Sequence, residues 1–383
     1  MCSYSVRGSI LVTLPKRISN VLDGLIRDLR SRESICGVGL FGSWSRGDAV
    51  LSSDVDLLIV DNKDFNYEYI ERLELENVLI DLDYVPEKWI LKGVPPEIDQ
   101  KLFETRVLYD RNWTLTNTKE WMTRTYWRPE RVDIRTENYL IESDTYLSRA
   151  ISSSNKGDFK SAVIYSWIGL EPILKILIEI CMLPISNSHF IEASREAVRE
   201  LNMPDILDNY FEISGLSNVQ LENIESRIQA IEEAWKEAIS NIEQNASSLE
   251  ALHTRIRNTL NYYGKPSFLK GLILRVRALL DSELYIEAAH YLARTFIDFI
   301  ENYMWLMSNI SGFRFDYTLL LSSLKGERDI PSRIYELGIK VLGIEDDLKK
   351  DKVQDIVAKA KQTALNVRRQ RKRLISENIK QPK

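Results

Sequence analysis

Two closely spaced aspartates begin one of the most apolar runs of the chain. Asp54 and Asp56 flank Val55, and Leu, Ile and Val fill the positions up to Val60. In a strand these two side chains share one face, with their Cβ atoms about 7 Å apart. At an effective dielectric of ~20, two ionised carboxylates at that distance repel each other by about 2 kcal/mol. The pattern therefore predicts a site for a divalent cation with oxygen ligands, Mg²⁺ or Mn²⁺.

A second apolar run also contains two aspartates on one face. Asp81 and Asp83 interrupt the segment from Leu79 to Val85, which Pro86 ends. A neighbouring strand lies about 4.8 Å away, so either aspartate could join the first pair around a metal ion. Three convergent carboxylates allow two-metal catalysis, in which one ion activates a hydroxyl and the other holds a triphosphate.

A glycine-rich turn precedes the first aspartate pair. Gly42 and Gly47 enclose Ser43 and Arg46, and the turn follows an apolar strand predicted at 35–41. Glycine accepts positive φ, so backbone N–H groups and the Ser43 hydroxyl can point toward one concave spot. The planar guanidinium of Arg46 suits a phosphate. The turn therefore predicts a nucleotide-binding site, although the chain has neither a P-loop nor a Gly-X-Gly-X-X-Gly motif.

Gly-Ser, ten residues and Asp-X-Asp follow one another here, from Gly42 to Asp56. This arrangement resembles the signature of the DNA polymerase β-like nucleotidyltransferase superfamily, in particular its minimal and kanamycin-type members. The resemblance covers about residues 35–85. It implies that Gly42 and Ser43 bind the triphosphate and that Asp54 and Asp56 bind metal ions. It also implies a third aspartate that orients the acceptor or acts as a base, for which Asp81 and Asp83 both remain candidates.

The elements that must position these residues form an α+β domain. Apolar periodicity predicts helices at 15–32 and 65–75 and strands at 35–41, 55–60, 77–85 and 106–109. We therefore expect a polymerase-β-like nucleotidyltransferase domain over residues 1–115. Helical periodicity prevails beyond Trp113, which predicts a helical domain over 116–265 and a second bundle segment over 266–383.

Composition narrows the class of protein. The 383 residues are 44% hydrophobic and 28% charged, which is typical of a globular chain. Three cysteines and three histidines are too few for a disulfide framework or most histidine metal sites. The most apolar segment, 168–185, contains Glu171, Lys175 and Glu179, which disfavour a membrane span. With no leader-like start, we expect a cytoplasmic protein.

The charge of the chain is unevenly distributed. Residues 348–383 contain 12 Lys or Arg and 3 Asp or Glu, a local charge of +9 on a chain of net charge −5. A helix predicted at 346–379 carries the basic cluster Arg368–Arg373. Such a helix can close over the nucleotide, bridge to a second subunit in a homodimer, or contact RNA. Because the rest of the chain is acidic, we favour a contact within the chain or between subunits.

These features predict an enzyme that moves a nucleoside monophosphate from an NTP, ATP in our expectation, to a hydroxyl group and releases pyrophosphate. The acceptor stays open between a small molecule, a protein side chain and RNA. A ribonuclease is disfavoured, since no histidine follows an arginine at the spacing found in helical ribonucleases of toxin–antitoxin systems. The alternative is a nucleotide-binding sensor without turnover.

Overall fold

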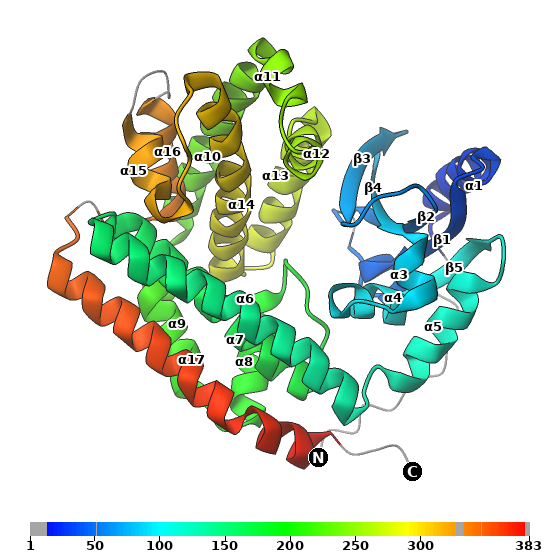
Figure 1. Cartoon of the computed structure of the whole chain (residues 1–383), viewed down its shortest axis with the longest axis horizontal. Coiled ribbons are helices and arrows are strands. Elements are labelled where there is room, and N and C mark those ends of the chain that lie inside the picture. Colours follow the sequence, from blue (N-terminus) through cyan, green and yellow to red (C-terminus); the bar gives the residue numbers. More distant parts are fainter. Residues whose placement is uncertain (1–13, 51, 327–331, 346, 380–383) are drawn as a thin grey trace. The chain divides into compact units, whose positions relative to one another are not determined.

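The structure is a computed structural model that describes residues 14–50, 52–326, 332–345 and 347–379. It divides into two compact units, one ending at Arg124 and the other beginning at Thr125 (Figure 1). The predicted division at 265/266 lies within the second unit, just before helix α13.

The N-terminal unit is built on a mixed five-stranded sheet in the order β3-β4-β2-β1-β5. Strands β2 and β4 run parallel, whereas the other neighbours are antiparallel. Helix α1 contributes the apolar stripe from Ile18 to Leu29 to the same core as the strands. The strands are β1 (Ile35–Phe41), β2 (Val55–Asp61), β3 (Tyr69–Leu75), β4 (Val78–Pro86) and β5 (Arg106–Asp110), and α1 spans Lys16–Ser31. The predicted α+β class is confirmed.

One predicted element is wrong, because residues 65–75 do not form a helix. Residues Tyr69–Leu75 form strand β3, which pairs with β4 as an antiparallel hairpin. The turn consists of Glu76 and Asn77, whose φ angles of 49° and 58° match the two-residue turns that favour hairpins. Only residues 72–75 alternate between charged and apolar types, so the strand signal in the sequence of β3 is weak.

Short helices connect the strands of this unit. Helix α2 occupies the glycine-rich turn between β1 and β2, and α4 lies just before β5. These two helices pack against each other and hold residues of the candidate site. The helices are α2 (Gly42–Arg46), α3 (Glu87–Lys92), the 3₁₀ turn η1 (Pro96–Ile98), α4 (Asp99–Glu104) and α5 (Thr114–Thr125).

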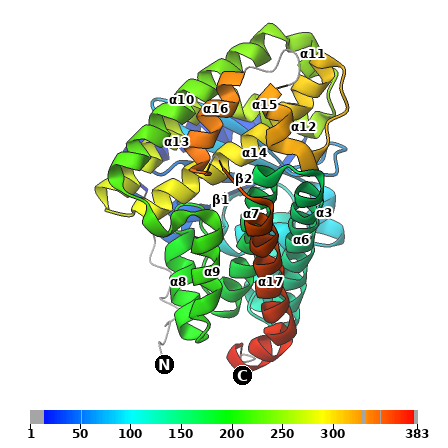
Figure 2. The same cartoon turned by 90° about the vertical axis from the view of Figure 1, so that its left-hand side faces the viewer.

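The described residues of the second unit form helices joined by loops, with no strand among them, and the helices pack in two groups (Figure 2). The first group is α6 (Pro129–Lys156), α7 (Phe159–Ile180), α8 (Phe190–Glu200), α9 (Pro204–Ser214) and α17 (Lys350–Asn378). The second is α10 (Leu221–Gln244), α11 (Ala246–Glu250), α12 (Thr254–Tyr263), α13 (Pro266–Asp281), α14 (Tyr285–Ser311), α15 (Leu320–Gly326) and α16 (Ser332–Leu342). Two 3₁₀ turns complete the unit, η2 (Leu216–Asn218) and η3 (Tyr317–Leu319).

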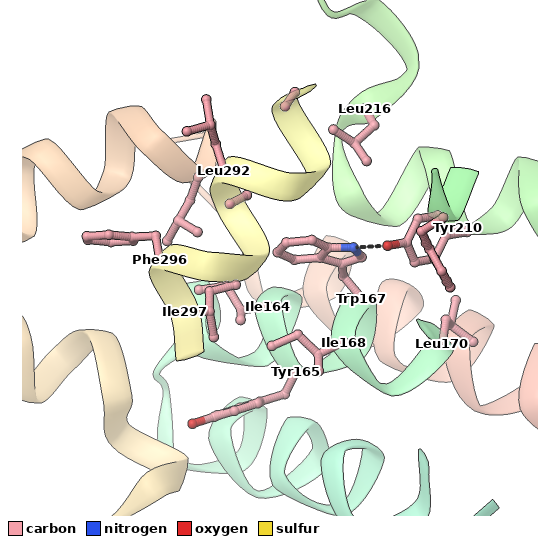
Figure 3. Close-up of a cluster of buried hydrophobic side chains, with 14 of the residues drawn as sticks. Ile164, Tyr165, Trp167, Ile168, Leu170, Tyr210, Leu216, Leu292, Phe296 and Ile297 are labelled. Atoms are coloured by element: carbon pink, nitrogen blue, oxygen red, sulfur yellow. Dashed lines mark hydrogen bonds between the residues drawn. The ribbon is translucent and has the colours of Figure 1, made fainter. Parts of the chain in front are cut away.

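Helix α7 is the central helix of the first group. It is long and apolar enough to cross a membrane, but 89% of its most apolar window is buried within the unit, as in a core helix. Its Trp167 donates a hydrogen bond of 2.6 Å to the hydroxyl of Tyr210 on α9 (Figure 3). Asp158 caps the helix by accepting from the backbone N–H of Ser161.

The basic helix α17 packs on α6 and α7. Arg371 is buried and donates to the carbonyl oxygen of Asp133 and the hydroxyl of Thr136, at 2.8 and 2.7 Å. Arg368 pairs with Asp144 on α6 at 2.5 Å. The chain therefore makes the predicted intramolecular contact between this helix and acidic residues. The predicted start of the helix at Asp346 lies outside the described residues.

Candidate active site

The aspartates of two parallel strands meet at the middle of the sheet. Asp56 on β2 lies directly beside Asp81 on β4, and Asp54 stands just before β2. One ligand atom from each of these three carboxylates lies within 4.8 Å of the other two. Three carboxylate oxygens at this spacing fit a hard divalent cation. We refer to Asp54, Asp56 and Asp81 as the carboxylate triad.

An arginine from the hairpin strand binds two members of the triad. Arg72 on β3 pairs in register with Asp81. Its Nε and Nη2 atoms donate to the two carboxylate oxygens of Asp81 at 2.6 and 2.5 Å, and Nη2 also reaches Asp54 at 2.7 Å. The residue is 5% exposed. One buried guanidinium therefore offsets part of the repulsion among the three carboxylates.

Asp83, the other candidate for the third carboxylate, has a different surrounding. It is buried, and its carboxylate forms an ion pair with Lys101 of α4, which also pairs with Glu68. Burial, together with Asp56 and Asp81, raises the pKa of Asp83 well above its ordinary value. Burial lowers the pKa of Lys101 to about 8, although Asp56 opposes this shift. The structure thus places Asp83 beside the triad, in a lysine-bridged pair of its own.

Gly42 lets the turn approach the triad. Its φ is 70°, a conformation that other residues rarely adopt. A Cβ atom at this position would lie 2.4 Å from a carboxylate oxygen of Asp56. The Ser43 carbonyl oxygen accepts from the backbone N–H groups of Gly47 and Asp48, which closes the turn. Glycine at position 42 is therefore required by the close contact between helix α2 and the start of β2.

Comparison with known proteins identifies the same residues as a nucleotidyltransferase domain. Residues 22–119 match the family of nucleotidyltransferase domains. The N-terminal unit is a polymerase-β-like nucleotidyltransferase domain. A curated protein of Methanocaldococcus jannaschii named "Putative protein adenylyltransferase" is 28% identical over 114 residues, which cover 25% of this chain and 75% of that protein.

A solved nucleotidyltransferase-like protein from Exiguobacterium sibiricum is 12% identical to the chain. The similarity covers 77% of this chain and 89% of that protein, with a TM-score of 0.33. That score is too low for a detailed comparison of the two folds.

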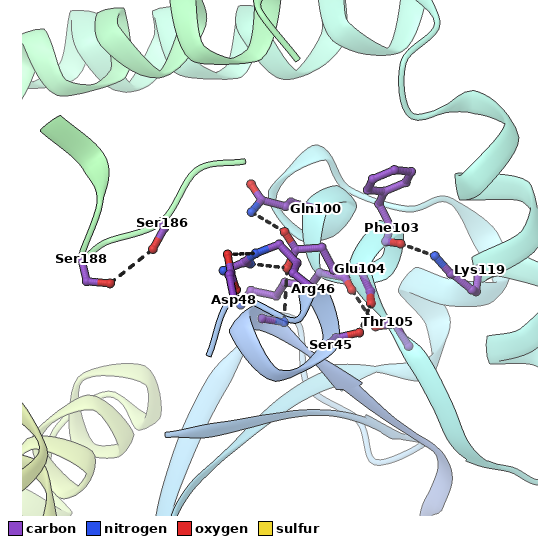
Figure 4. Close-up of polar contacts among 12 residues, drawn as sticks. Ser45, Arg46, Asp48, Gln100, Phe103, Glu104, Thr105, Lys119, Ser186 and Ser188 are labelled. Carbon is purple, nitrogen blue, oxygen red and sulfur yellow. Dashed lines mark hydrogen bonds and ion pairs between the residues drawn. The ribbon is translucent and has the colours of Figure 1, made fainter. Parts of the chain in front are cut away.

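In the nucleotidyltransferase domain, Arg46 and Glu104 join helices α2 and α4 (Figure 4). The Glu104 carboxylate accepts from Arg46 at 2.7 Å, from the Gly42 N–H at 3.2 Å and from Gln100 at 2.8 Å. Arg46 also pairs with Asp48. Burial alone would lower the pKa of Arg46, but Glu104 and Asp48 keep it above its ordinary value. Arg46 therefore stays charged at the turn where a triphosphate is expected.

Three charged residues of this domain were missed by sequence reasoning: Arg72, Lys101 and Glu104. Arg72 was hidden by the expectation of a helix at 65–75, since only a hairpin places it opposite Asp81. The sequence 69–75 alternates only over its last four residues, so periodicity alone gives little sign of this strand. Lys101 and Glu104 belong to a short helix whose sequence carries no signal that it packs against the turn.

Proposed function

We propose that this protein is an adenylyltransferase that moves AMP from ATP to a hydroxyl group of an acceptor and releases pyrophosphate. The observation that carries the proposal is the carboxylate triad directly beside the Gly42–Arg46 turn, inside a nucleotidyltransferase domain. A sensor that only bound nucleotide would not require three convergent carboxylates.

Each side of the site has a separate role in this proposal. Gly42, Ser43 and Arg46 form the triphosphate side of the site: the Gly42 N–H donates to Glu104, and the Ser43 hydroxyl and the Arg46 guanidinium would contact the negative phosphates. The acceptor oxygen bonds to the α-phosphorus while the bond to the β-phosphate oxygen breaks, and pyrophosphate leaves with that electron pair. The proton of the acceptor hydroxyl passes to a carboxylate of the triad.

Asp54, Asp56 and Asp81 would hold the divalent metal. Mg²⁺ or Mn²⁺ suits their oxygen ligands, and when bound it supplies charge stabilisation for the phosphoryl group and lowers the pKa of the attacking hydroxyl. The chain's own contribution is to hold three carboxylates on adjacent strands and to aim the turn at them.

We favour a protein hydroxyl as the acceptor. The support is the printed name of the archaeal relative, which describes protein adenylylation and matches the domain that contains the triad. A small hydroxylated molecule and RNA are the alternatives.

Labelled ATP distinguishes these acceptors. The purified chain is incubated with Mg²⁺, a cytoplasmic extract of its own organism and ATP labelled at either the α- or the γ-phosphate. The products are then separated into protein, RNA and small molecules. Label from the α-phosphate should appear in protein, and label from the γ-phosphate should be recovered as pyrophosphate. Transfer of the γ-label to protein, to RNA or to a small molecule other than pyrophosphate or phosphate would indicate a kinase and overturn the proposal.

Asp56→Asn is the matched control, because it removes one negative charge from the triad and keeps the size of the side chain. It should abolish transfer while the melting temperature changes little. If this variant and the wild type both bind ATP and neither transfers label, the chain is a sensor. If both transfer label equally, the triad is not the active site.

A further inference from the structure

Arg72 lies where a cation bound to two of the triad carboxylates would lie. Its Nη2 atom is 2.7 Å from an oxygen of Asp54 and 2.5 Å from an oxygen of Asp81. The Nε atom, at 2.6 Å, takes the other oxygen of Asp81. This fork takes one acceptor site on each oxygen of Asp81, and a carboxylate has about four such sites, so Asp81 can still bind a metal ion beside Arg72.

The backbone fixes Arg72 in this position. Residues 72 and 81 are direct neighbours across the β3–β4 hairpin, and Asp81 is the direct neighbour of Asp56 on β2. The three side chains therefore form one row across three adjacent strands. With its side chain 4% exposed, Arg72 has little freedom to swing into solvent.

The charge of Arg72 is permanent. A guanidinium does not lose its proton in proteins, so titration cannot release Asp54 and Asp81 from it. Removing this contact would leave three neighbouring carboxylates with one positive charge less. A second divalent ion would have to take the place of Arg72 between Asp54 and Asp81. While Arg72 stays there, its positive charge repels such an ion.

We propose that Arg72 is the second cation of this site, so that the triad works with Arg72 and a single divalent ion rather than with two divalent ions. The inference rests on the metal site of the proposed function and makes it more specific. Arg72 is then a positioning residue, which holds Asp54 and Asp81 while the metal ion binds to the same triad.

Counting bound Mn²⁺ tests this assignment without measuring activity. The full chain is titrated with Mn²⁺ in the presence of a non-hydrolysable ATP analogue, and free Mn²⁺ is followed by electron paramagnetic resonance. The wild type should bind a single ion per chain. Arg72→Met and Arg72→Gln, which both remove the charge, should bind a second ion. Gln keeps an N–H group that can donate to Asp81. The Gln variant therefore still tests the assignment if the Met variant does not fold.

Melting curves give an independent measurement. In EDTA, both neutral variants should melt below the wild type, and Mn²⁺ should raise their melting temperatures more than that of the wild type. Lys101→Met is the matched control, since it removes an equal charge from the neighbouring pair with Asp83. This control should still bind a single ion.

Two ions on the wild type would overturn the assignment of Arg72 and leave the transfer of α-label intact. A single ion on both neutral variants would overturn it too, as would failure of both to fold even in Mn²⁺. If neither the wild type nor any variant bound Mn²⁺, the triad would not be a metal site, and the proposed function would fail as well.

Discussion

In the helical unit, the buried carboxylate of Glu179 accepts two hydrogen bonds from Arg135, at 3.0 and 2.7 Å. Arg135 thus donates twice to a single carboxylate. In the nucleotidyltransferase domain, by contrast, the guanidinium of Arg72 is divided between Asp54 and Asp81. Both units bury acidic groups, but the Arg135–Glu179 pair is one-to-one, whereas two triad carboxylates have the same arginine as a partner.

This difference separates structural carboxylates from functional ones. The opposite charges of Arg135 and Glu179 are matched within one buried pair. By contrast, the three triad carboxylates converge within 4.8 Å of one another, and Asp83 beside them keeps an oxygen without a hydrogen-bond partner among the described residues. Convergent acidic groups whose pKa values are shifted, as that of Asp83 is, are typical of a functional site.

Asp81→Asn gives the largest effect that follows from this comparison. Loss of an outer contact to a metal ligand lowers activity 10–100-fold, so loss of a ligand should lower α-label transfer by at least roughly a hundredfold. The unfolding free energy should change by less than about 1 kcal/mol, because the substitution also removes a repelling charge. Transfer assays and urea unfolding measure the two quantities. A large loss of stability would make Asp81 structural, like Glu179.

Glu179→Gln should show the opposite behaviour. Arg135 is 2% exposed, and removing its charged partner leaves a buried cation, which lowers the unfolding free energy by about 3–5 kcal/mol. Urea unfolding measures this loss. Glu120→Gln is the control, since its pair with Arg124 is exposed and should contribute less than about 1 kcal/mol. Equal stability of the two variants would contradict the comparison.

Much of the candidate site could be predicted from the sequence, since it depends on local pattern. Asp54 and Asp56 interrupt an apolar strand, and Gly42 belongs to a turn of fixed spacing, so both are visible without the fold. The choice of Asp81 as the neighbour of Asp56 required the register between two strands.

Arg72 and Glu104 could not be found from local pattern. Arg72 reaches the triad only because β3 and β4 pair through a two-residue turn, and Glu104 reaches Gly42 across 62 residues of sequence. Such contacts depend on how elements pack, which periodicity does not encode. The fold class, in contrast, followed from the change of periodicity after Trp113.

Glu287 gives a pH-dependent effect in the helical unit. It is 2% exposed, and burial raises its pKa to about 7, although backbone N–H groups of Glu192 and Ile191 oppose the shift. The folded state therefore keeps a proton that the unfolded state releases above about pH 4.5, so stability is lost as the pH rises through 7.

Glu287→Gln removes this titration. At ~1.4 kcal/mol per pH unit, the variant should be about 3–4 kcal/mol more stable than the wild type at pH 8 and equal to it near pH 4. Urea unfolding at both pH values measures the difference. Glu222→Gln, at an exposed carboxylate on α10, should show no such dependence. A gain that is the same at both pH values would exclude Glu287 titration as its cause.

The basic cluster of α17 gives the smallest effect, because its members differ in burial. Arg371 is 3% exposed and bonded to α6, whereas Arg369 and Lys372 are exposed. Arg371→Gln should lower the unfolding free energy by about 2 kcal/mol, the contribution of hydrogen bonds that involve a charged group. The double substitution Arg369→Gln and Lys372→Gln should change it by less than about 0.5 kcal/mol.

A filter assay on the double variant tests the RNA alternative. If the double variant kept its stability but lost binding to RNA, the exposed cations would bind RNA, and RNA would replace protein as the proposed acceptor.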